Sequence, residues 1–295
     1  MAGFRRSSAA PGDCPVRPAA TALWRAVSGA ARRQELLTRF VVGAMLAGVA
    51  LVALKLGGVL FWLLCAALSL GVLREWAMLA GAGANTRRLM LLALLVPLAI
   101  LSPFAIVPPV AHSPYFLALG LIGGAAMFVG AVTRQAFLAG GIVYAGLPVL
   151  ALLLIRDQPR GLEYAFWTLG LVWLCDIGAY FAGRWIGGAR LAPAISPNKT
   201  WAGALGGIAL ASAFGAALHI YAGLPWRLTL ASPALAILAE GGDLFESWLK
   251  RQAGVKDSGT LLPGHGGLLD RLDGLVPVAP VAAMLVMLPQ IRGLF

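Results

Sequence analysis

Residues 136–155 read AFLAGGIVYAGLPVLALLLI, and none of these twenty side chains carries a charge. A helix of this length rises about 30 Å, which matches the hydrocarbon core of a bilayer. Similar apolar stretches recur along the chain and are predicted to cross a membrane together with this one. They are residues 37–56, 58–73, 89–107, 115–133, 136–155, 164–183, 203–222, 228–246 and 274–291. The sequence therefore predicts an all-α, polytopic integral membrane protein with about nine transmembrane helices.

The composition excludes the other broad classes of protein. Of the 295 residues, 60% are hydrophobic and 12% are charged. A soluble domain averages about 45–50% apolar and about 25% charged residues. One soluble core would leave much of this apolar surface in water, and a disordered chain needs low hydrophobicity.

The basic residues predict how the chain is oriented. With the N-terminus in the cytoplasm and nine spans, 18 of the 23 Lys and Arg residues lie on the cytoplasmic side. This agrees with the positive-inside rule. It places two long polar loops, 184–202 and 247–273, on the same cytoplasmic face and the C-terminus outside.

The same pattern divides the chain into three parts. Residues 1–36 form a basic tail without the apolar core of a signal peptide. We interpret this tail as a membrane-adjacent cytoplasmic segment rather than a nucleic-acid-binding arm. Residues 37–160 hold the first five helices, and residues 161–295 hold the rest with both polar loops.

The acidic residues point to the place where chemistry occurs. Five of the twelve lie between Asp243 and Asp273. Glu240, Asp243, Ser247 and Lys250 are spaced by three, four and three residues, so they share one face of a helix. Charged groups at membrane depth are costly, which favours a functional cluster over a simple ion pair.

The loop after this helix reads KDSGTLLPGHGGLLDRLDG over residues 256–274. Glycines around His265 allow backbone N–H groups to approach phosphate oxygens, although ordinary turns also use glycine. Alternatives stay open for three side chains: a backbone-bonded turn for His265, an Asx turn for Asp257 and a helix N-cap for Asp273. Asp270 has no comparable structural explanation.

The other loop, and the helix before it, add cations and neutral polar groups. Asp176, Tyr180 and Gly183 share a helix face. The residues that follow are the cations Arg184, Arg190 and Lys199, and the polar side chains Ser196, Asn198 and Thr200. Carboxylates with clustered cations suit Mg²⁺ and a polyphosphate. The chain has no GxxxxGK[ST], CxxC, HExxH or GxSxG motif, so P-loop, haem, zinc-protease and serine-hydrolase sites lack support.

Residues 247–273 resemble the signature of the phosphatidate cytidylyltransferases, also called CDP-diacylglycerol synthases. The matching positions are Ser247, Lys250, Arg251, Lys256, Asp257, Gly259, Leu262, Pro263, His265, Gly266, Gly267, Asp270, Arg271 and Asp273. A second block, from Asp176 to Gly207, is similar to the family's characteristic loop. Before about residue 160 the resemblance extends only to apolar helices.

The resemblance implies transfer of CMP from CTP to phosphatidate, giving CDP-diacylglycerol and pyrophosphate, with Mg²⁺ held by Asp243 and Asp270. It implies a catalytic region at 161–295, in the inner (plasma) membrane, with the active site facing the cytoplasm and phosphatidate drawn from the inner leaflet. The implied catalytic residues are Asp243, Asp270, His265, Lys256 and Asp257. The implied substrate-binding residues are Ser196, Asn198, Lys199, Lys250, Arg251, Gly266, Gly267, Arg271 and Asp176. No nucleic-acid partner is expected, and homodimer formation is left open.

Two other functions compete with this hypothesis. A CTP-dependent lipid kinase would use the same metal, nucleotide and membrane. An ion-coupled transporter would place paired acids near the membrane midplane in both halves of the chain. The acids here crowd one end of one half, which favours an enzyme.

Overall fold

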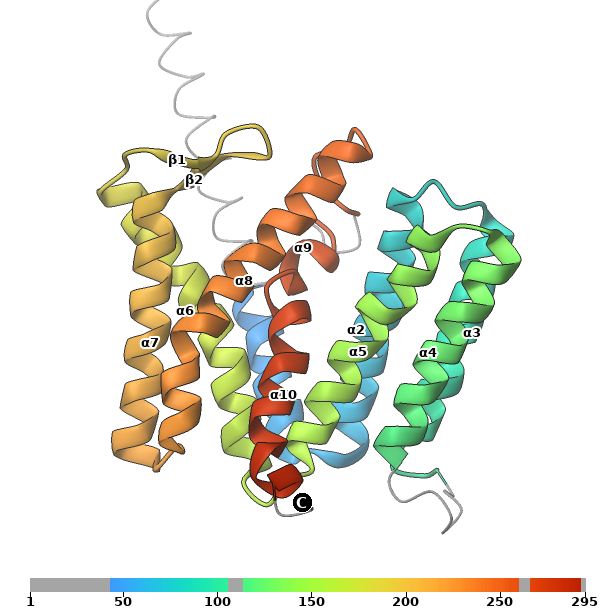
Figure 1. Ribbon diagram of the computed structural model, residues 1–295, viewed down its shortest axis with the longest axis horizontal. Helices are drawn as coiled ribbons and strands as arrows, with labels where there is room; N and C mark the ends of the chain where they lie inside the picture. The colour runs from blue at the N-terminus through green and yellow to red at the C-terminus, as the bar shows by residue number, and fades with distance from the viewer. Residues whose placement is uncertain (1–42, 106–113, 260–265, 293–295) are drawn as a thin grey trace, which may run out of the picture. The chain divides into compact units, whose positions relative to one another are not determined.

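The computed structural model describes residues 43–105, 114–259 and 266–292, and it is almost entirely helical (Figure 1). The helices are Gly43–Leu56, α2 (Gly58–Leu79), α3 (Ala84–Ile100), α4 (Pro114–Thr133), α5 (Ala136–Arg156), α6 (Gly161–Trp185), α7 (Trp201–Ala222), α8 (Trp226–Gln252), α9 (Leu269–Leu272) and α10 (Leu275–Arg292). Strands β1 (Arg190–Ala192) and β2 (Ser196–Thr200) form an antiparallel hairpin inside the predicted loop 184–202. Each predicted span thus has a helix in the described residues. The prediction of an all-α protein is confirmed.

Seven helical stretches in the described part of the chain are long and apolar enough to cross a membrane. They are α2, α4, α5, α6, α7, α8 and the stretch Leu269–Pro289, which contains most of α10. The polytopic membrane class is therefore confirmed. The helix Gly43–Leu56 is shorter, and α3 has 17 residues. The count of nine, and the side on which each terminus lies, remain predictions.

Helices α6 and α7 pack closely because glycine faces glycine. A Cβ atom added to Gly178 would lie 2.6 Å from the carbonyl oxygen of Gly206, and one added to Gly207 would lie 2.7 Å from that of Cys175. No larger side chain fits these positions without separating the helices. Small residues at the contact between two membrane helices allow their backbones to approach in this way.

The beginning of α7 is set by the end of the hairpin. The Thr200 hydroxyl accepts a hydrogen bond from the N–H of Gly203 at 3.1 Å, an N-cap. The hairpin therefore runs directly into α7, which fixes the position of β2 relative to α6 and α7.

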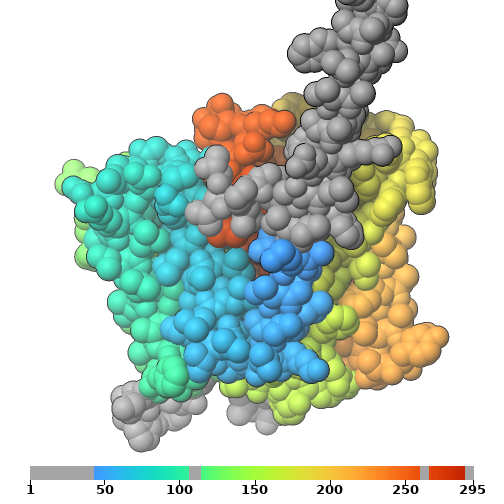
Figure 2. All heavy atoms as spheres, turned by 180° about the vertical axis from the view of Figure 1, so that it is seen from behind, coloured from blue at the N-terminus to red at the C-terminus, as the bar shows by residue number. Residues whose placement is uncertain are grey.

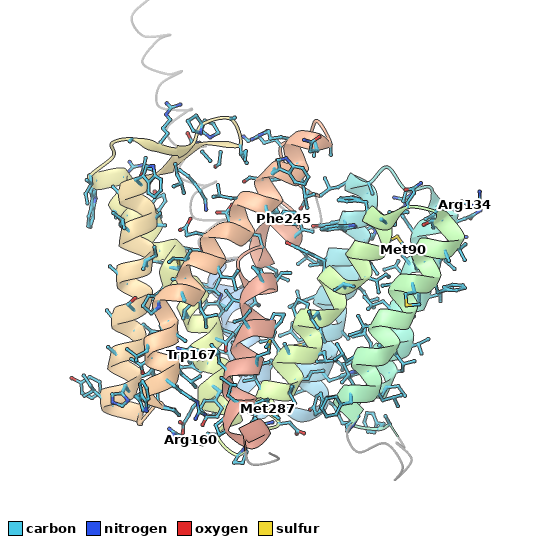
Figure 3. The ribbon with its side chains drawn as sticks, in the orientation of Figure 1. Met90, Arg134, Arg160, Trp167, Phe245 and Met287 are labelled. Carbon is cyan, nitrogen blue, oxygen red and sulfur yellow. The ribbon has the colours of Figure 1, made fainter. Side chains whose placement is uncertain are left out.

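An aromatic cluster joins α2 to α5 and α8. The ring of Trp76 stacks on Phe137 with centroids 4.6 Å apart, and its Nε1–H donates to the Phe137 carbonyl at 2.9 Å. Phe245 of α8, labelled in Figure 3, lies 6.3 Å from the same ring, centroid to centroid. These contacts hold α2, an element of the first half, against the second half.

Other contacts fasten the opposite end of the helices, where Figure 3 places Arg160 and Met287. Arg160 donates to the carbonyl oxygens of Ala222 and Gly223 at 2.7 and 2.9 Å and forms an ion pair with Glu163. On the face shown in Figure 2, residues 47–56 lie beside α2, and the Arg156 Nε–H donates to the Leu54 carbonyl at 2.9 Å. The site described below lies at the end that carries the hairpin and α9.

Candidate active site

A polar cleft of about 640 Å³ opens between α6, β2, α7, α8 and the segment that carries α9. Its charged and polar lining consists of Asp176, Tyr180, Arg184, Asn198, Lys199, Thr200, Glu240, Asp243, Asp270, Arg271 and Asp273. Six of these are site residues predicted from the sequence: Asp176, Asn198, Lys199, Asp243, Asp270 and Arg271. The fold therefore brings both predicted loops to one cavity.

Lys199 joins the hairpin to α8. Its Nζ lies 2.6 Å from Oε2 of Glu240 and 2.8 Å from Oδ2 of Asp243. Burial opposes the positive charge of Lys199, but Asp243 and Glu240 outweigh it and raise the pKa of Lys199 above its usual value. A permanent positive charge thus lies among the acids of the cleft.

Lys250 forms a second, deeper ion pair. Its Nζ lies 2.6 Å from Oε2 of Glu246 and 2.7 Å from Oδ1 of Asp270. The Glu246 side chain is 1% exposed, and those of Lys250 and Asp270 are 13% and 11% exposed. Lys250 therefore fastens α8 to α9 from within the protein, and it does not line the cleft.

Asp270 is held in one orientation by the loop around it. Its Oδ2 accepts hydrogen bonds from the backbone N–H groups of Ser258 and Gly267, at 3.1 and 2.8 Å, and the Ser258 hydroxyl, which also contacts Glu75, lies 3.0 Å from it. Gly266 has φ +78°, and a Cβ there would lie 2.9 Å from Oδ2 of Asp270. The glycines thus let the backbone approach this carboxylate, and the Gly267 amide is already engaged by it.

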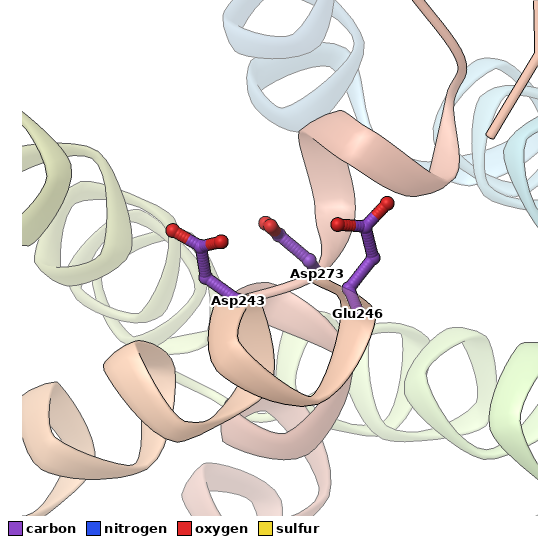
Figure 4. A group of neighbouring side chains, drawn as sticks. All are labelled: Asp243, Glu246 and Asp273. Carbon is purple, nitrogen blue, oxygen red and sulfur yellow. The ribbon is translucent and has the colours of Figure 1, made fainter. Parts of the chain in front are cut away.

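Three carboxylates meet at the side of α8 (Figure 4). One oxygen each from Asp243, Glu246 and Asp273 can be chosen so that all lie within 4.8 Å of one another. A hard divalent cation prefers such an oxygen-only ligand set. Oε1 of Glu246 is buried and has no hydrogen-bonding partner among the described residues, so it could serve as a ligand for a cation. The cluster therefore fits a metal ion.

This cluster overlaps only partly with the two metal ligands implied by the resemblance. Asp243 belongs to both sets. Asp270 is not one of the three clustered carboxylates, but it lines the same cleft, and Lys250 forms ion pairs with both Asp270 and Glu246. Oδ1 of Asp273 accepts the N–H of Gly274 at 2.7 Å, close to the start of α10. An N-cap side chain would instead bond the N–H of the second or third residue of the helix, so the N-cap alternative for Asp273 stays a prediction.

Several predicted residues lie outside the lining of the cleft. Arg251 donates from Nε to the carbonyl of Ile195 at 3.3 Å, so it braces the hairpin. Lys256 and Asp257 are exposed. Ser196, Gly266 and Gly267 do not line the cleft either. His265 lies outside the described residues.

One residue that contacts this region was not among those predicted from the sequence. Glu75 of α2 is 1% exposed and hydrogen-bonds the segment around Ser258 and Leu268. The predicted span 58–73 ends before it, so Glu75 was placed in a connection where acids are ordinary. The feature of the sequence that could have identified Glu75 is a single acidic residue next to the aromatic Trp76.

Comparison with known proteins decides the family. A family model described as the cytidylyltransferase family matches residues 37–288, most of the chain. The chain belongs to the cytidylyltransferase family.

Curated relatives of this cytidylyltransferase family member carry a more specific name. A phosphatidate cytidylyltransferase of Brucella suis is 51% identical over 144 residues, which are 48% of this chain and 53% of the relative. Those of Staphylococcus epidermidis and Bacillus subtilis are 40% identical over 154 and 156 residues, covering 51% and 52% of this chain and 58% of each relative. The match thus spans about half the length of these relatives.

The family match extends beyond the predicted catalytic region 161–295. It begins at residue 37, where the predicted basic tail ends, and it includes both halves of the helical region. The contacts of α2 with α5, α8 and the Asp270 loop agree with this, because residues from both sides of residue 160 support the cleft.

Proposed function

We propose that this protein is a phosphatidate cytidylyltransferase, which converts CTP and phosphatidate to CDP-diacylglycerol and pyrophosphate in phospholipid biosynthesis. The observation that carries the proposal is the polar cleft: acids and cations converge at one end of apolar, membrane-length helices. A soluble nucleotide and a membrane lipid can both reach such a place. The family and the names of the relatives support the same reaction.

The proposed step is a displacement at phosphorus. A phosphate oxygen of phosphatidate bonds to the α-phosphorus of CTP as the bond from that phosphorus to the oxygen bridging to the β-phosphate breaks, and pyrophosphate leaves with the electron pair. The attacking oxygen is already anionic at neutral pH, so no protein base is required. Arg184, Lys199 and Arg271 line the cleft and supply positive charge for the phosphates.

We propose that the cation of this site is Mg²⁺, held by Asp243, Glu246 and Asp273, with Asp270 as a further ligand beside them. When bound, Mg²⁺ would neutralise phosphate oxygens and stabilise the leaving pyrophosphate. Asp243 also contacts Lys199, so the acid that we assign to the metal lies next to a cation that we assign to phosphate. His265, Lys256 and Asp257 stay proposed catalytic residues because they match the signature.

The proposed setting is the inner membrane, with the cleft facing the cytoplasm. The bias of basic residues supports this orientation, since both loops that form the cleft lie on the lysine- and arginine-rich side. CTP would then enter from the cytosol and phosphatidate from the adjoining leaflet.

Position-specific labelling tests the function against the kinase alternative. Purified protein in mixed micelles receives phosphatidate, Mg²⁺ and CTP labelled on either the α- or the γ-phosphorus. We expect α-label in the lipid phase and γ-label in soluble pyrophosphate. Lipid labelled only from the γ-position would make the protein a kinase, and no labelled lipid from either nucleotide would reject both.

A further inference from the structure

A buried acid from the first half of the chain lies beneath the loop that carries Asp270. Glu75 of α2 accepts the N–H of Leu268 on Oε1 at 3.0 Å and the N–H of Leu269 on Oε2 at 2.8 Å. Oε2 also accepts the hydroxyl of Ser258 at 2.9 Å. A buried carboxylate needs such donors because it has lost water, so three donors of the loop satisfy it.

Two glycines give this carboxylate its space. A Cβ atom on Gly259 would lie 2.5 Å from Oε1 of Glu75, and one on Gly267 would lie 2.8 Å from its Cδ. Real Cβ atoms do not approach other atoms so closely, so only glycine fits at these positions. The loop backbone therefore closes directly on Glu75 from two sides.

Ser258 connects this buried acid to the cleft. Its hydroxyl lies 2.9 Å from Oε2 of Glu75 and 3.0 Å from Oδ2 of Asp270, and its side chain is buried. Asp270 and the next residue, Arg271, both line the cleft. Because a hydroxyl has one proton, Ser258 donates its hydroxyl to Glu75 and its backbone N–H to Asp270 at 3.1 Å, and it thereby links α2 to the wall of the proposed active site.

The position of α2 does not depend on this link. Trp76, the next residue, stacks on Phe137 and bonds its carbonyl, which attaches α2 to α5 independently. Loss of the Glu75 carboxylate would thus leave the helices in place and release the loop. This separates a role in positioning from a role in holding the bundle together.

We propose that Glu75 is a positioning residue for cytidylyl transfer: it fixes the backbone at Ser258 and at Leu268–Leu269 so that Asp270 and Arg271 face the cleft. The inference rests on the proposed function for its effect on rate. Its effect on the loop is measured separately, without substrate.

The test compares Glu75→Gln with the wild-type protein. Glutamine keeps the shape but replaces one acceptor oxygen with an NH₂ group that opposes the loop donors. We expect kcat to fall at least about tenfold, because small misplacements of groups around reacting phosphates are costly. The KM for CTP should change less than kcat does, because two of the three cations proposed to bind phosphate, Arg184 and Lys199, lie outside the loop. Glu75→Asp, which keeps both acceptors on a shorter side chain, should recover part of kcat.

Hydrogen exchange supplies the readout that does not require activity. In Glu75→Gln the amides of Leu268 and Leu269 should exchange faster, whereas those of α7 should not change. The matched control is Glu163→Gln, which removes an acid at the opposite end of the helices, where it pairs with Arg160. This variant should keep normal turnover and normal exchange.

The possible outcomes separate the two proposals. If the wild-type protein makes no CDP-lipid, the proposed function fails. The exchange rates of the Leu268 and Leu269 amides, compared between Glu75→Gln and wild type, still test whether Glu75 fixes the loop. Wild-type kcat or unchanged exchange in Glu75→Gln overturns the inference. If exchange rises throughout the helices, the variant has unfolded, and Glu75→Asp, which keeps the charge but shortens its reach to the amides of Leu268 and Leu269, takes its place; wild-type kcat together with wild-type exchange in that variant overturns the inference as well.

Discussion

Replacing Lys250 with methionine should destabilise the protein, because its ammonium group lies between two buried carboxylates. The Glu246 side chain is 1% exposed and that of Asp270 is 11% exposed. Removing one partner of a buried ion pair costs about 3–5 kcal/mol, since the remaining charge stays buried. Lys250 itself is 13% exposed, so the lower value, about 3 kcal/mol, applies. At about 2–4 °C per kcal/mol, Tm should fall by roughly 6–12 °C.

The assay is thermal unfolding of purified protein in detergent without nucleotide. Lys256→Met serves as the matched control, because Lys256 is an exposed lysine a few residues along the chain, and its Tm should stay unchanged. The double variant Lys250→Met with Glu246→Gln should regain most of the lost Tm. Glutamine removes the orphaned charge, and Asp270 keeps its bonds from Ser258 and Gly267.

This prediction also separates two roles for Lys250. The resemblance implies that it binds substrate, whereas the structure shows it bound to Glu246 and Asp270. If Lys250→Met lost activity but kept its Tm, the ion pair would not support the fold. If the double variant were as unstable as the single one, the buried charge of Glu246 would not be the cause. Either result would refute the reasoning.

Two further predictions concern the cleft, and a third concerns the orientation of the chain in the membrane. Asp243→Asn and Asp270→Asn should each lower turnover by at least about 100-fold while the protein stays folded and membrane-inserted, because an amide keeps the shape but weakens Mg²⁺ binding; near-normal turnover at ordinary Mg²⁺ would contradict the ligand assignment. In steady-state kinetics, Lys199→Ala and Arg271→Ala should each raise the KM for CTP or lower kcat about 10–100-fold, which is the effect of losing a charged hydrogen bond. Full activity in both variants would show that these cations only set the membrane topology. Reporter fusions should place the N-terminus in the cytoplasm and Phe295 outside, and a cytoplasmic Phe295 would mean an error of one in the number of spans.

The sequence alone determined the class of fold, and the physical reason is the solvent. Inside a bilayer every backbone N–H and C=O must bond within the protein, and a continuous apolar run of twenty residues such as 136–155 meets this requirement as a helix, since a barrel strand is shorter and alternates apolar with polar residues. Apolar length therefore located a helix for every predicted span in the described residues. The ends were less exact: the predicted span 58–73 continues to Leu79, because Arg74 and Glu75 ended the apolar run but not the helix.

Local spacing also anticipated part of the candidate site. Glu240 and Asp243 share a helix face, as their spacing predicted, and both contact Lys199. Asp176 and Tyr180 line the same cleft, as expected from positions four residues apart on one helix. Helical periodicity was sufficient here because each pair belongs to a single element.

Only the tertiary structure decided which elements meet. Asp273 joins Asp243 and Glu246 because the segment before α10 returns to the side of α8. Ser258 meets Glu75 across 183 residues because α2 is held against α5 and α8 by an aromatic cluster. Such pairs depend on the angles and depths at which helices cross, and these arise from packing between distant side chains. The hydrophobic periodicity of a single helix does not indicate these crossing angles and depths. The partners of Glu75, Lys250 and Asp270 therefore became known only from the fold.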